Sequence, residues 1–345
     1  MAEYPEAQYF IYTSDTDVNG AELEQVETNK WGSYNDYTKV WYAAPGKISQ
    51  NLLKQVEKIK PDIIFMVGLY SWHFTLVPLI YCKSPRKIVS VRGMLHPGAL
   101  AQKKWKKWLF IKSFRLFEWQ YKTDFHATND EEKVFIINSL GKQAKVHIAP
   151  NFPTLFGYRS LPSQSPDLRL ISIGLVTQMK NILLVLESLR SCNHHIDYRI
   201  YGAIKDEEYY DECRKLAKQL PENISVTFNG ELPFDKVENA IHDAHVFILP
   251  SRSENFGHAI FEALSAGRPV ITSDFTPWNG LEKARAGINV DLTSKSVYRA
   301  IDFFAEMSEI ELNEWSEGAR AYALLHYEKE AVISAYQNMF ANLPT

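Results

Sequence analysis

Hydrophobic and polar positions alternate along the chain as short apolar runs separated by amphipathic segments. The run at 63–69 (IIFMVGL) is continuous, and the preceding segment 48–62 (ISQNLLKQVEKIKPD) has helical periodicity and is stopped by Pro61. Continuous apolar runs of this length are typical of strands buried on both faces of a parallel sheet. Further strand patterns occur at 9–15, 37–43, 87–93 and 145–151. Strands alternating with helices indicate βαβ units, so the first half is predicted to be an α/β domain.

The same alternation restarts after a segment rich in Pro, Ser and Gly at 152–168, which we interpret as a linker. Strand patterns follow at 168–174, 197–202, 224–230, 245–251 and 269–274, with helical patterns between them. This predicts a second doubly wound α/β domain. We therefore expect an N-terminal domain at 1–155, a C-terminal domain at 166–325, and a last helical segment at 326–345 that returns to the first domain.

The composition narrows the class of protein. The 345 residues suggest two domains, at roughly one per 150 residues, and 46% apolar with 23% charged residues fits a soluble globular protein. The net charge of −3 gives no overall attraction to nucleic acid or to a membrane. Cys82, Cys192 and Cys213 are far apart and lack zinc-ligand spacing, which favours a reducing compartment. We find no signal peptide and no apolar run near ~18 residues, so we expect a cytoplasmic protein.

The stretch at 251–270 (SRSENFGHAIFEALSAGRPV) places Glu254 and Glu262 in a segment that is otherwise typical of buried structure. Glu254 follows a predicted strand, and open parallel sheets bind ligands at the carboxyl ends of their strands. Gly257 lies near a predicted helix start, whose N–H groups suit a phosphate. Glu262, about one turn further on, is placed to accept hydrogen bonds from a ribose diol. Alternatively, Glu262 is an exposed helix residue and Glu254 a first-turn residue favoured by the helix dipole, and the residues alone leave both open.

Several motifs resemble one family. The segment 253–274 (SENFGHAIFEALSAGRPVITSD) is similar to the E-x7-E segment of retaining family-4 glycosyltransferases of the GT-B fold. Supporting motifs at 13–17, 61–71, 91–107, 126–133, 150–153 and 273–278 fit a bacterial branch associated with surface polysaccharides such as lipopolysaccharide. The resemblance covers nearly all of the chain. It implies two facing Rossmann-like doubly wound domains with an intervening cleft.

The resemblance also implies roles for the residues of this segment. The first glutamate of the motif contacts the donor sugar and the second contacts the ribose, which assigns these roles to Glu254 and Glu262. Backbone amides around Phe256, Gly257 and His258 would hold the diphosphate of a nucleotide sugar.

The family's Gly-Arg…Lys element reads IGLVTQMKN at 173–181. Gly174 and Lys180 match it, and the resemblance gives Lys180 the task of neutralising the leaving diphosphate. The arginine position holds Leu175, which is a departure from the pattern. Phosphate charge would then rest on Lys180 and the helix start, helped by Arg252, although a lysine does not grip a phosphate in bidentate fashion as arginine does.

The first domain supplies the remaining candidates. Arg92, in SVRGMLHPG, stands where many relatives carry a histidine, and we expect it to hold a phosphate or the acceptor. His96 is a weaker candidate, and Asn151 is expected near the cleft, with turn capping as its ordinary role. The chain begins at what resembles the family's second strand, and its early part has no Gly-Gly, so we expect a shortened first domain.

The segment 103–122 (KKWKKWLFIKSFRLFEWQYK) carries seven basic residues and one acidic residue among aromatics. Phe110, Phe114, Phe117 and Tyr121 recur at helical spacing, which favours a core helix. For Trp105, Trp108 and the lysines around them we favour contact with an anionic membrane surface, because basic faces beside Trp and Phe suit anionic lipid.

Together these observations predict a metal-independent enzyme that moves a hexosyl group, with retention, from a nucleotide-diphosphate sugar to a hydroxyl of a glycan or lipid-linked glycan. No cofactor, metal or nucleic acid is expected, since the Asp-x-Asp spacing in SDTD at 14–17 lies in the wrong domain for a donor metal. The expected location is the cytoplasm, peripheral at the inner face of the plasma membrane. Two alternatives stay open: a sugar-nucleotide epimerase or phosphorylase of the same architecture, and a non-catalytic GT-B partner, which Leu175 and the short front end would favour.

Overall fold

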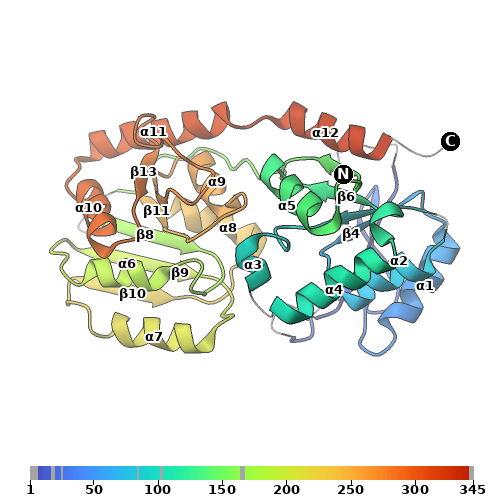
Figure 1. Cartoon of the computed structure of the whole chain (residues 1–345). Coiled ribbons are helices and arrows are strands. Elements are labelled where there is room, and N and C mark those ends of the chain that lie inside the picture. Colours follow the sequence, from blue (N-terminus) through green and yellow to red (C-terminus); the bar gives the residue numbers. More distant parts are fainter. Residues whose placement is uncertain are drawn as a thin grey trace. The chain divides into compact units, whose positions relative to one another are not determined.

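The computed structural model describes residues 7–16, 20–24, 26–83, 85–101, 104–163 and 168–341. They form two compact units (Figure 1). The first contains the described residues up to Phe152 and those from Lys329 onward, and the second runs from Pro153 to Glu328.

The second unit is built on a six-stranded parallel sheet in the order β10-β9-β8-β11-β12-β13. Its strands are β8 (Leu168–Ile173), β9 (Ile196–Tyr201), β10 (Ile224–Phe228), β11 (Val246–Leu249), β12 (Val270–Ser273) and β13 (Gly287–Val290). Its helices are α6 (Ile182–Leu189), α7 (Glu207–Ala217), α8 (Phe234–His242), α9 (His258–Ser265), α10 (Ser294–Ala305) and α11 (Glu309–Leu325). Strands and helices alternate as the sequence predicts.

The continuous apolar run of β11 is explained by cores on both faces of this sheet. Val246 and Ile248 belong to the core that includes residues of α6, α7 and α10. Phe247 and Leu249 point to the other core, with residues of α8, α9 and α11. Because successive side chains of a strand face opposite ways, a strand covered on both sides favours apolar residues along its whole length.

The first unit contains two sheets. One is parallel, in the order β4-β5-β6-β7, and the other has the order β1-β3-β2, with β2 antiparallel to β3. The strands are β1 (Tyr9–Ser14), β2 (Trp31–Asn35), β3 (Thr38–Ala43), β4 (Ile63–Val67), β5 (Arg86–Ser90), β6 (Asp124–Ala127) and β7 (Val146–Ile148). The strand β2 was not predicted, because its sequence, WGSYN, carries little apolar character.

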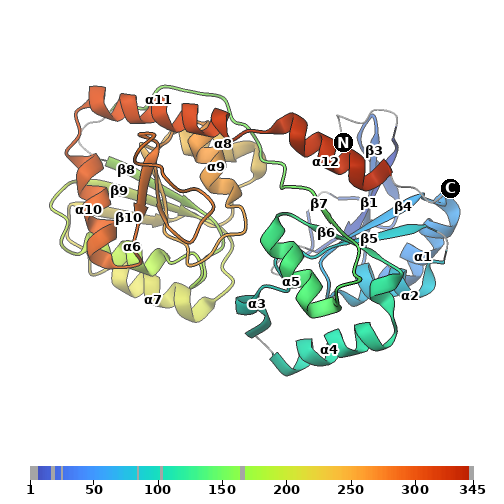
Figure 2. The same cartoon turned by 45° about the horizontal axis from the view of Figure 1, so that its top comes forward.

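The helices of the first unit are α1 (Ile48–Ile59), α2 (Val77–Tyr81), α3 (Pro97–Ala101), α4 (Lys104–Leu116), α5 (Asp130–Leu140) and α12 (Lys329–Ala341). A π-helical turn at Trp72–Leu76 leads into α2, and a 3₁₀ turn occupies Trp119–Tyr121. In Figure 2, α12 lies over the unit that contains β7. Arg86 donates to the Met339 carbonyl at 2.7 Å, and the rings of Phe65 and Phe340 are 6.0 Å apart, so polar and apolar contacts both hold α12 there.

Two sequence interpretations need correction. The described part of the predicted linker, up to residue 163, packs within the second unit from Pro153 onward: Phe156 is buried, its N–H donates to Ser265 Oγ at 3.0 Å, and its carbonyl accepts from Arg320 at 2.6 Å. The proposed core stripe holds only for Phe110 and Phe114. The helix ends at Leu116 and Glu118 is left-handed (φ 55°), so Phe117 and Tyr121 leave the helical face and are each 56% exposed.

Candidate functional site

The carboxyl ends of the parallel strands of the second unit meet at one edge of the sheet, where such sheets bind ligands. At this edge Gly174 follows β8 and Gly202 follows β9, and their backbones pack closely. A Cβ on Gly202, at φ +148°, would lie 1.8 Å from the Gly174 carbonyl oxygen, so only glycine fits. Sequence reasoning selected Gly174 but missed Gly202. The available signal was that β8, β9 and β10 are each followed within two residues by glycine.

The loop between β11 and α9 carries Arg252 and Glu254 and is tied to its neighbours by backbone hydrogen bonds. The Arg252 N–H donates to the Met179 carbonyl at 2.8 Å, and the Glu254 N–H donates to the Phe275 carbonyl at 3.1 Å. Ser251 Oγ donates to Glu254 Oε1 at 2.8 Å. These bonds fix the Glu254 carboxylate at the sheet edge beside the loop that follows β8.

Lys180 and Glu254 form an ion pair at this edge, with Lys180 Nζ donating to Glu254 Oε1. Their side chains are 21% and 10% exposed, so the pair is largely shielded but still reachable from solvent. The sequence selected both residues for separate roles, one toward phosphate and one toward the sugar. The structure brings them into direct contact across 74 residues of chain.

The start of α9 is shaped by Gly257 and Trp278. Gly257 precedes the helix with φ +76°, a conformation that strains any residue with a side chain. The Phe256 carbonyl accepts from Trp278 Nε1 at 2.6 Å, and Trp278 itself is buried. In the first turn of α9 the Ile260 N–H donates to the Gly257 carbonyl at 3.0 Å, and the start of the helix carries positive partial charge, which suits an anion.

Glu262 lies one turn into α9, half-buried, and differs from Glu254 in its surroundings. Among the described residues no side chain or backbone N–H donates to its carboxylate. Burial therefore acts without compensation and raises its pKa from 4.5 to about 7. A half-buried carboxylate without a donor has the capacity to accept hydrogen bonds from hydroxyl groups.

Arg252 and Leu175 are both solvent-exposed at this edge. Arg252 borders an open groove of about 450 Å³, with Asn181, Tyr209 and Phe275 among the other residues that line it. Leu175, at the position where the family carries arginine, is 41% exposed. An exposed apolar side chain next to a predicted phosphate site leaves room for the longer arginine.

In the first unit, Arg92 and Asn151, which the sequence selected as separate candidates, are in contact, with Arg92 Nη1 donating to Asn151 Oδ1. Arg92 has φ 52° and is followed by Gly93 at φ 73°, so two successive residues are left-handed. This turn is held by Glu132, a buried residue that sequence reasoning missed. The Glu132 carboxylate accepts from the Gly93 N–H and from the Thr128 N–H and hydroxyl.

His96 is less well placed for a reaction. Its Nδ1 accepts from the Gly98 N–H at 3.1 Å, and its ring packs edge-on against Phe135 at 5.1 Å. Both contacts are those of a residue that shapes its own turn, and the sequence had given His96 only as a weaker candidate than Arg92.

Among the described residues, one group could hold a metal ion: His194, Asp302 and Glu306. His194 precedes β9, so this group lies at the amino ends of the strands, the edge of the sheet opposite to Lys180 and Glu254. It is therefore separate from the candidate site.

The basic surface of α4 carries exposed aromatics, with Trp105 and Trp108 at 67% and 56% exposure. Lys112 Nζ lies 4.0 Å from the centre of the Trp108 ring. Trp105 and Trp108 are thus not core residues, which removes the alternative that they pack inside the first domain. No helix in the described part of the chain has the length and apolar character needed to cross a bilayer. Lys103, part of the predicted surface, lies outside the described residues.

Part of the chain is similar in sequence to known glycosyltransferases. Residues 159–321 match the family model described as "Glycosyl transferases group 1". A sulfoquinovosyl transferase of Arabidopsis thaliana is 32% identical over 88 residues, covering 26% of this chain and 16% of the relative. An O-antigen biosynthesis glycosyltransferase of Escherichia coli, WclY, is 26% identical over 169 residues, covering 49% of this chain and 45% of the relative. The chain thus matches less than half the length of these curated relatives.

Solved structures cover more of the chain. Anabaena HepE in complex with UDP-glucose has a TM-score of 0.68 at 13% identity, covering 97% of this chain and 99% of HepE. Sucrose-phosphate synthase from Thermosynechococcus elongatus has a TM-score of 0.67 at 16% identity, covering 96% and 89%. WaaG, a glycosyltransferase involved in lipopolysaccharide biosynthesis, has a TM-score of 0.63 at 15% identity, covering 90% and 89%. The likeness at this identity confirms the fold: the chain has the GT-B fold.

Proposed function

We propose that this protein is a glycosyltransferase that moves a hexosyl group from a nucleotide-diphosphate sugar to a hydroxyl of a glycan or lipid-linked glycan, with retention and without a metal ion. The observation that carries the proposal is the arrangement at the edge of the second sheet. A paired Lys180–Glu254 and an unpaired Glu262 flank the start of α9. The match to the glycosyltransferase model spans these residues, and HepE of the same fold binds UDP-glucose.

The roles follow from charge and position. The start of α9 provides N–H groups for the diphosphate, and Glu262 accepts hydrogen bonds from the ribose hydroxyls. Lys180 stabilises the charge that develops on the leaving diphosphate, an electrostatic role that requires no protein nucleophile. Its present partner, Glu254, then accepts hydrogen bonds from hydroxyls of the donor sugar, so donor binding exchanges one internal ion pair for two contacts with ligand.

The first unit is proposed to serve the acceptor. Arg92, fixed by Asn151 and by the turn that Glu132 holds, presents a cation to a phosphate or glycan, with His96 four residues on. The exposed tryptophans and lysines of α4 would hold this unit on the inner face of the plasma membrane, where a lipid-linked acceptor is found. The Escherichia coli relative named for O-antigen biosynthesis supports a surface polysaccharide as product.

A non-catalytic GT-B partner is the second candidate, and the exposed Leu175 at the arginine position favours it. The two are separated by a thermal-shift panel of nucleoside diphosphates and nucleotide sugars, followed by product analysis with the donor that binds. An enzyme should be stabilised by one nucleotide sugar and transfer its hexose. The partner should show no shift with any of them. Turnover of the donor without acceptor would instead favour an epimerase.

The site assignment is tested with Lys180→Ala. Because the lysine neutralises the diphosphate, this variant should bind the donor more weakly and lose most transfer. Lys205→Ala, a lysine in the loop that follows β9, is the matched control and should retain both. Equal loss in the two variants would mean that Lys180 has no special place in catalysis.

The membrane role is tested by co-sedimentation with vesicles. Lys104, Lys106 and Lys112 are exposed on α4, whereas Lys107 donates to the Ala99 carbonyl and is left unchanged. Replacing the three with Gln should weaken binding to anionic vesicles about a hundredfold, at ~1 kcal/mol per lysine, and salt should have the same effect.

The control carries the same loss of charge in the second unit, Lys215→Gln, Lys218→Gln and Lys236→Gln, all at exposed positions. It should bind vesicles like the parent. Vesicle binding that is equal for anionic and neutral lipid, or equal in the two triple variants, would contradict a surface at α4.

A further inference from the structure

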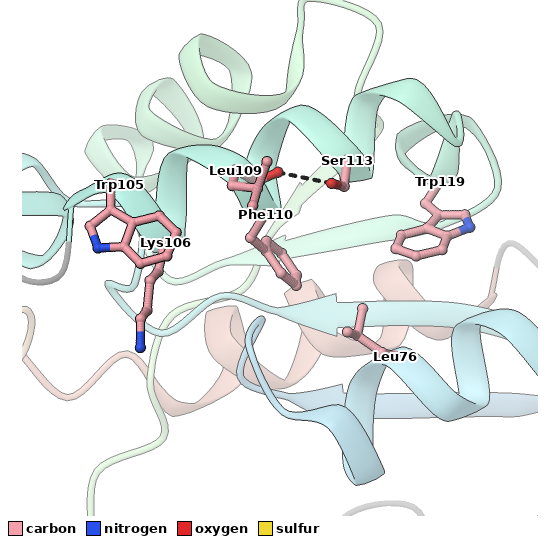
Figure 3. A pocket seen from close by; sticks show the side chains of 7 residues that line it. All are labelled: Leu76, Trp105, Lys106, Leu109, Phe110, Ser113 and Trp119. Atoms are coloured by element: carbon pink, nitrogen blue, oxygen red, sulfur yellow. Dashed lines mark hydrogen bonds between the residues drawn. The ribbon is translucent and has the colours of Figure 1, made fainter.

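A groove of about 370 Å³ runs beside α4 in the first unit. Figure 3 shows it between the helix and the segment that carries Leu76, with Phe110 pointing into it and Trp105 and Trp119 at opposite ends. The residues that line it are Leu76, Trp105, Lys106, Leu109, Phe110, Ser113 and Trp119.

The inner wall of the groove is fixed by the core, while its outer wall is open. The Phe110 ring packs edge-on against Tyr70 at 4.9 Å, and Trp119 packs edge-on against Phe114 at 5.4 Å. Trp105 and Leu109, on the outer wall, are 67% and 52% exposed. Contiguous exposed apolar surface of this kind marks an interaction site. Because the inner wall is already rigid, binding a ligand costs little conformational entropy in the protein.

The polar groups of the groove restrict what can fill it. Its one hydroxyl, on Ser113, already donates to the Leu109 carbonyl at 2.9 Å, as Figure 3 shows. The other donors of the lining side chains are the indole N–H groups of Trp105 and Trp119 and the Lys106 ammonium, all toward the two ends (Figure 3). The polar groups of a peptide backbone or a sugar along the middle of the groove would therefore lose their water without compensation. A hydrocarbon chain has no such groups and loses nothing.

The positive charge of α4 favours a ligand that carries a negative group. Helix α4 carries five basic residues and no acidic one. Lys106 stands at the Trp105 end of the groove, with its Nζ 5.7 Å from the centre of that ring (Figure 3). An occupant with a negative group at this end and an apolar chain toward Trp119 would complement both features.

We propose that this groove binds one hydrocarbon chain of an anionic lipid, with the headgroup at Lys106. This inference rests on one part of the proposed function, the contact of α4 with a membrane, because that membrane supplies the lipid. It goes further in assigning a built site for a single lipid molecule, so that the protein extracts one chain in addition to adsorbing on many headgroups.

The test uses phosphatidylglycerol with short brominated chains, kept below its micelle concentration, and follows quenching of tryptophan fluorescence. Affinity should rise about three- to fourfold for each methylene added, until the groove is full. Ser113→Phe fills the groove from α4 and should lower affinity about tenfold, the equivalent of about two buried methylenes. Leu116→Phe, at a position that is 78% exposed and outside the groove, should bind like the parent.

Lys106→Gln tests the headgroup. It should lower the affinity for phosphatidylglycerol about fivefold and leave phosphatidylcholine of the same chain length unchanged. Leu109→Gln, on the exposed wall, repeats the groove test should Ser113→Phe fail to fold, and should also lower affinity. Undiminished quenching in these groove variants would overturn the chain site, and equal affinity for the two lipids would overturn the headgroup assignment.

The same preparations are tested by thermal shift with the panel of nucleoside diphosphates and nucleotide sugars, which reports on the proposed nucleotide site. Lipid binding that persists in a protein without nucleotide affinity would leave the groove assignment standing while the proposed enzyme failed. Nucleotide affinity without any quenching would do the reverse.

Discussion

Donor affinity should rise with pH through neutrality, because Glu262 must be ionised to accept hydrogen bonds from a ribose diol. In the free protein, burial without a compensating donor raises its pKa to about 7. Two hydroxyl donors favour the ionised form, so ligand binding lowers this pKa again. Affinity is then weak below pH 7, where a proton must first leave, and reaches its full value above it.

The size of the effect follows from the two pKa values. If the bound carboxyl returns to its ordinary pKa of 4.5, it is almost fully ionised in the complex from pH 6 upward, so the titration of the free protein alone sets the change in affinity. At pH 6 roughly a tenth of the free carboxyls are ionised and at pH 8 roughly nine tenths, so affinity should differ about tenfold.

Calorimetric titration with UDP-glucose measures this directly, since its diphosphate, substituted at both ends, has no ionisation in this range. Glu262→Gln should bind about tenfold more weakly than the parent at pH 8 and show no change between pH 6 and pH 8. A 2′-deoxy analogue should show a smaller pH dependence with the parent. Affinity that does not vary with pH in the parent, or varies equally in Glu262→Gln, would refute the ribose role.

The stability of the ligand-free protein provides an independent check that the pKa of Glu262 is raised. A carboxyl whose folded-state pKa lies above its unfolded value binds more protons when folded. Stability should therefore fall as pH rises from about 4.5 to about 7, and Glu262→Gln should remove that decline. Melting curves across this range measure it.

Three further changes test other parts of the second unit. Leu175→Arg should tighten the binding of a nucleoside diphosphate more than that of a monophosphate, because a guanidinium pairs with two phosphate oxygens. The gain in affinity should shrink as salt is added. If calorimetry finds no gain at low salt, the positive charge that the diphosphate needs is supplied by another residue. Glu254→Gln releases Lys180 from its ion pair, so diphosphate binding should tighten several-fold while the rate of transfer falls. Weaker diphosphate binding in this variant would instead mean that Glu254 contacts the nucleotide. Gly202→Ala should destabilise the protein by about 3 kcal/mol or more in denaturant unfolding, because its Cβ would lie 1.8 Å from a carbonyl oxygen. Gly230→Ala, at φ +70° with no atom within 4 Å, should cost only ~1 kcal/mol, and equal losses would deny Gly202 its packing role.

Much of the second unit could be predicted from the sequence because its signals are local. The strand β11 is apolar at every position, and the two glutamates and Gly257 follow it in one continuous segment. The order of elements along the chain then places that segment at the carboxyl edge of the sheet. The likeness to a family added the roles of residues that periodicity could not select, such as Lys180.

What could not be predicted depends on contacts between distant residues. Nothing in the sequence around Lys180 indicates that its ammonium is paired with Glu254, or that Trp278 fixes the loop before Gly257. Composition also misleads where chain packs without regular structure, as at Phe156. The aromatic stripe failed at Phe117 for a related reason, because periodicity does not reveal that the helix has already ended.

Glu254 and Glu262, the two glutamates of one motif, thus lie in opposite surroundings, one with hydrogen-bond donors and one without. Their spacing in the sequence could not reveal this difference. Lys180 and Ser251 both donate to the Glu254 carboxylate, so a donor must displace or share those partners. Glu262 has no such partner and bears the cost of burial until a ligand supplies hydrogen bonds. A donor that satisfies Glu262 and draws Lys180 toward its diphosphate therefore changes both carboxylates at once. Binding at the start of α9 is in this way coupled to the freeing of Glu254 for the sugar.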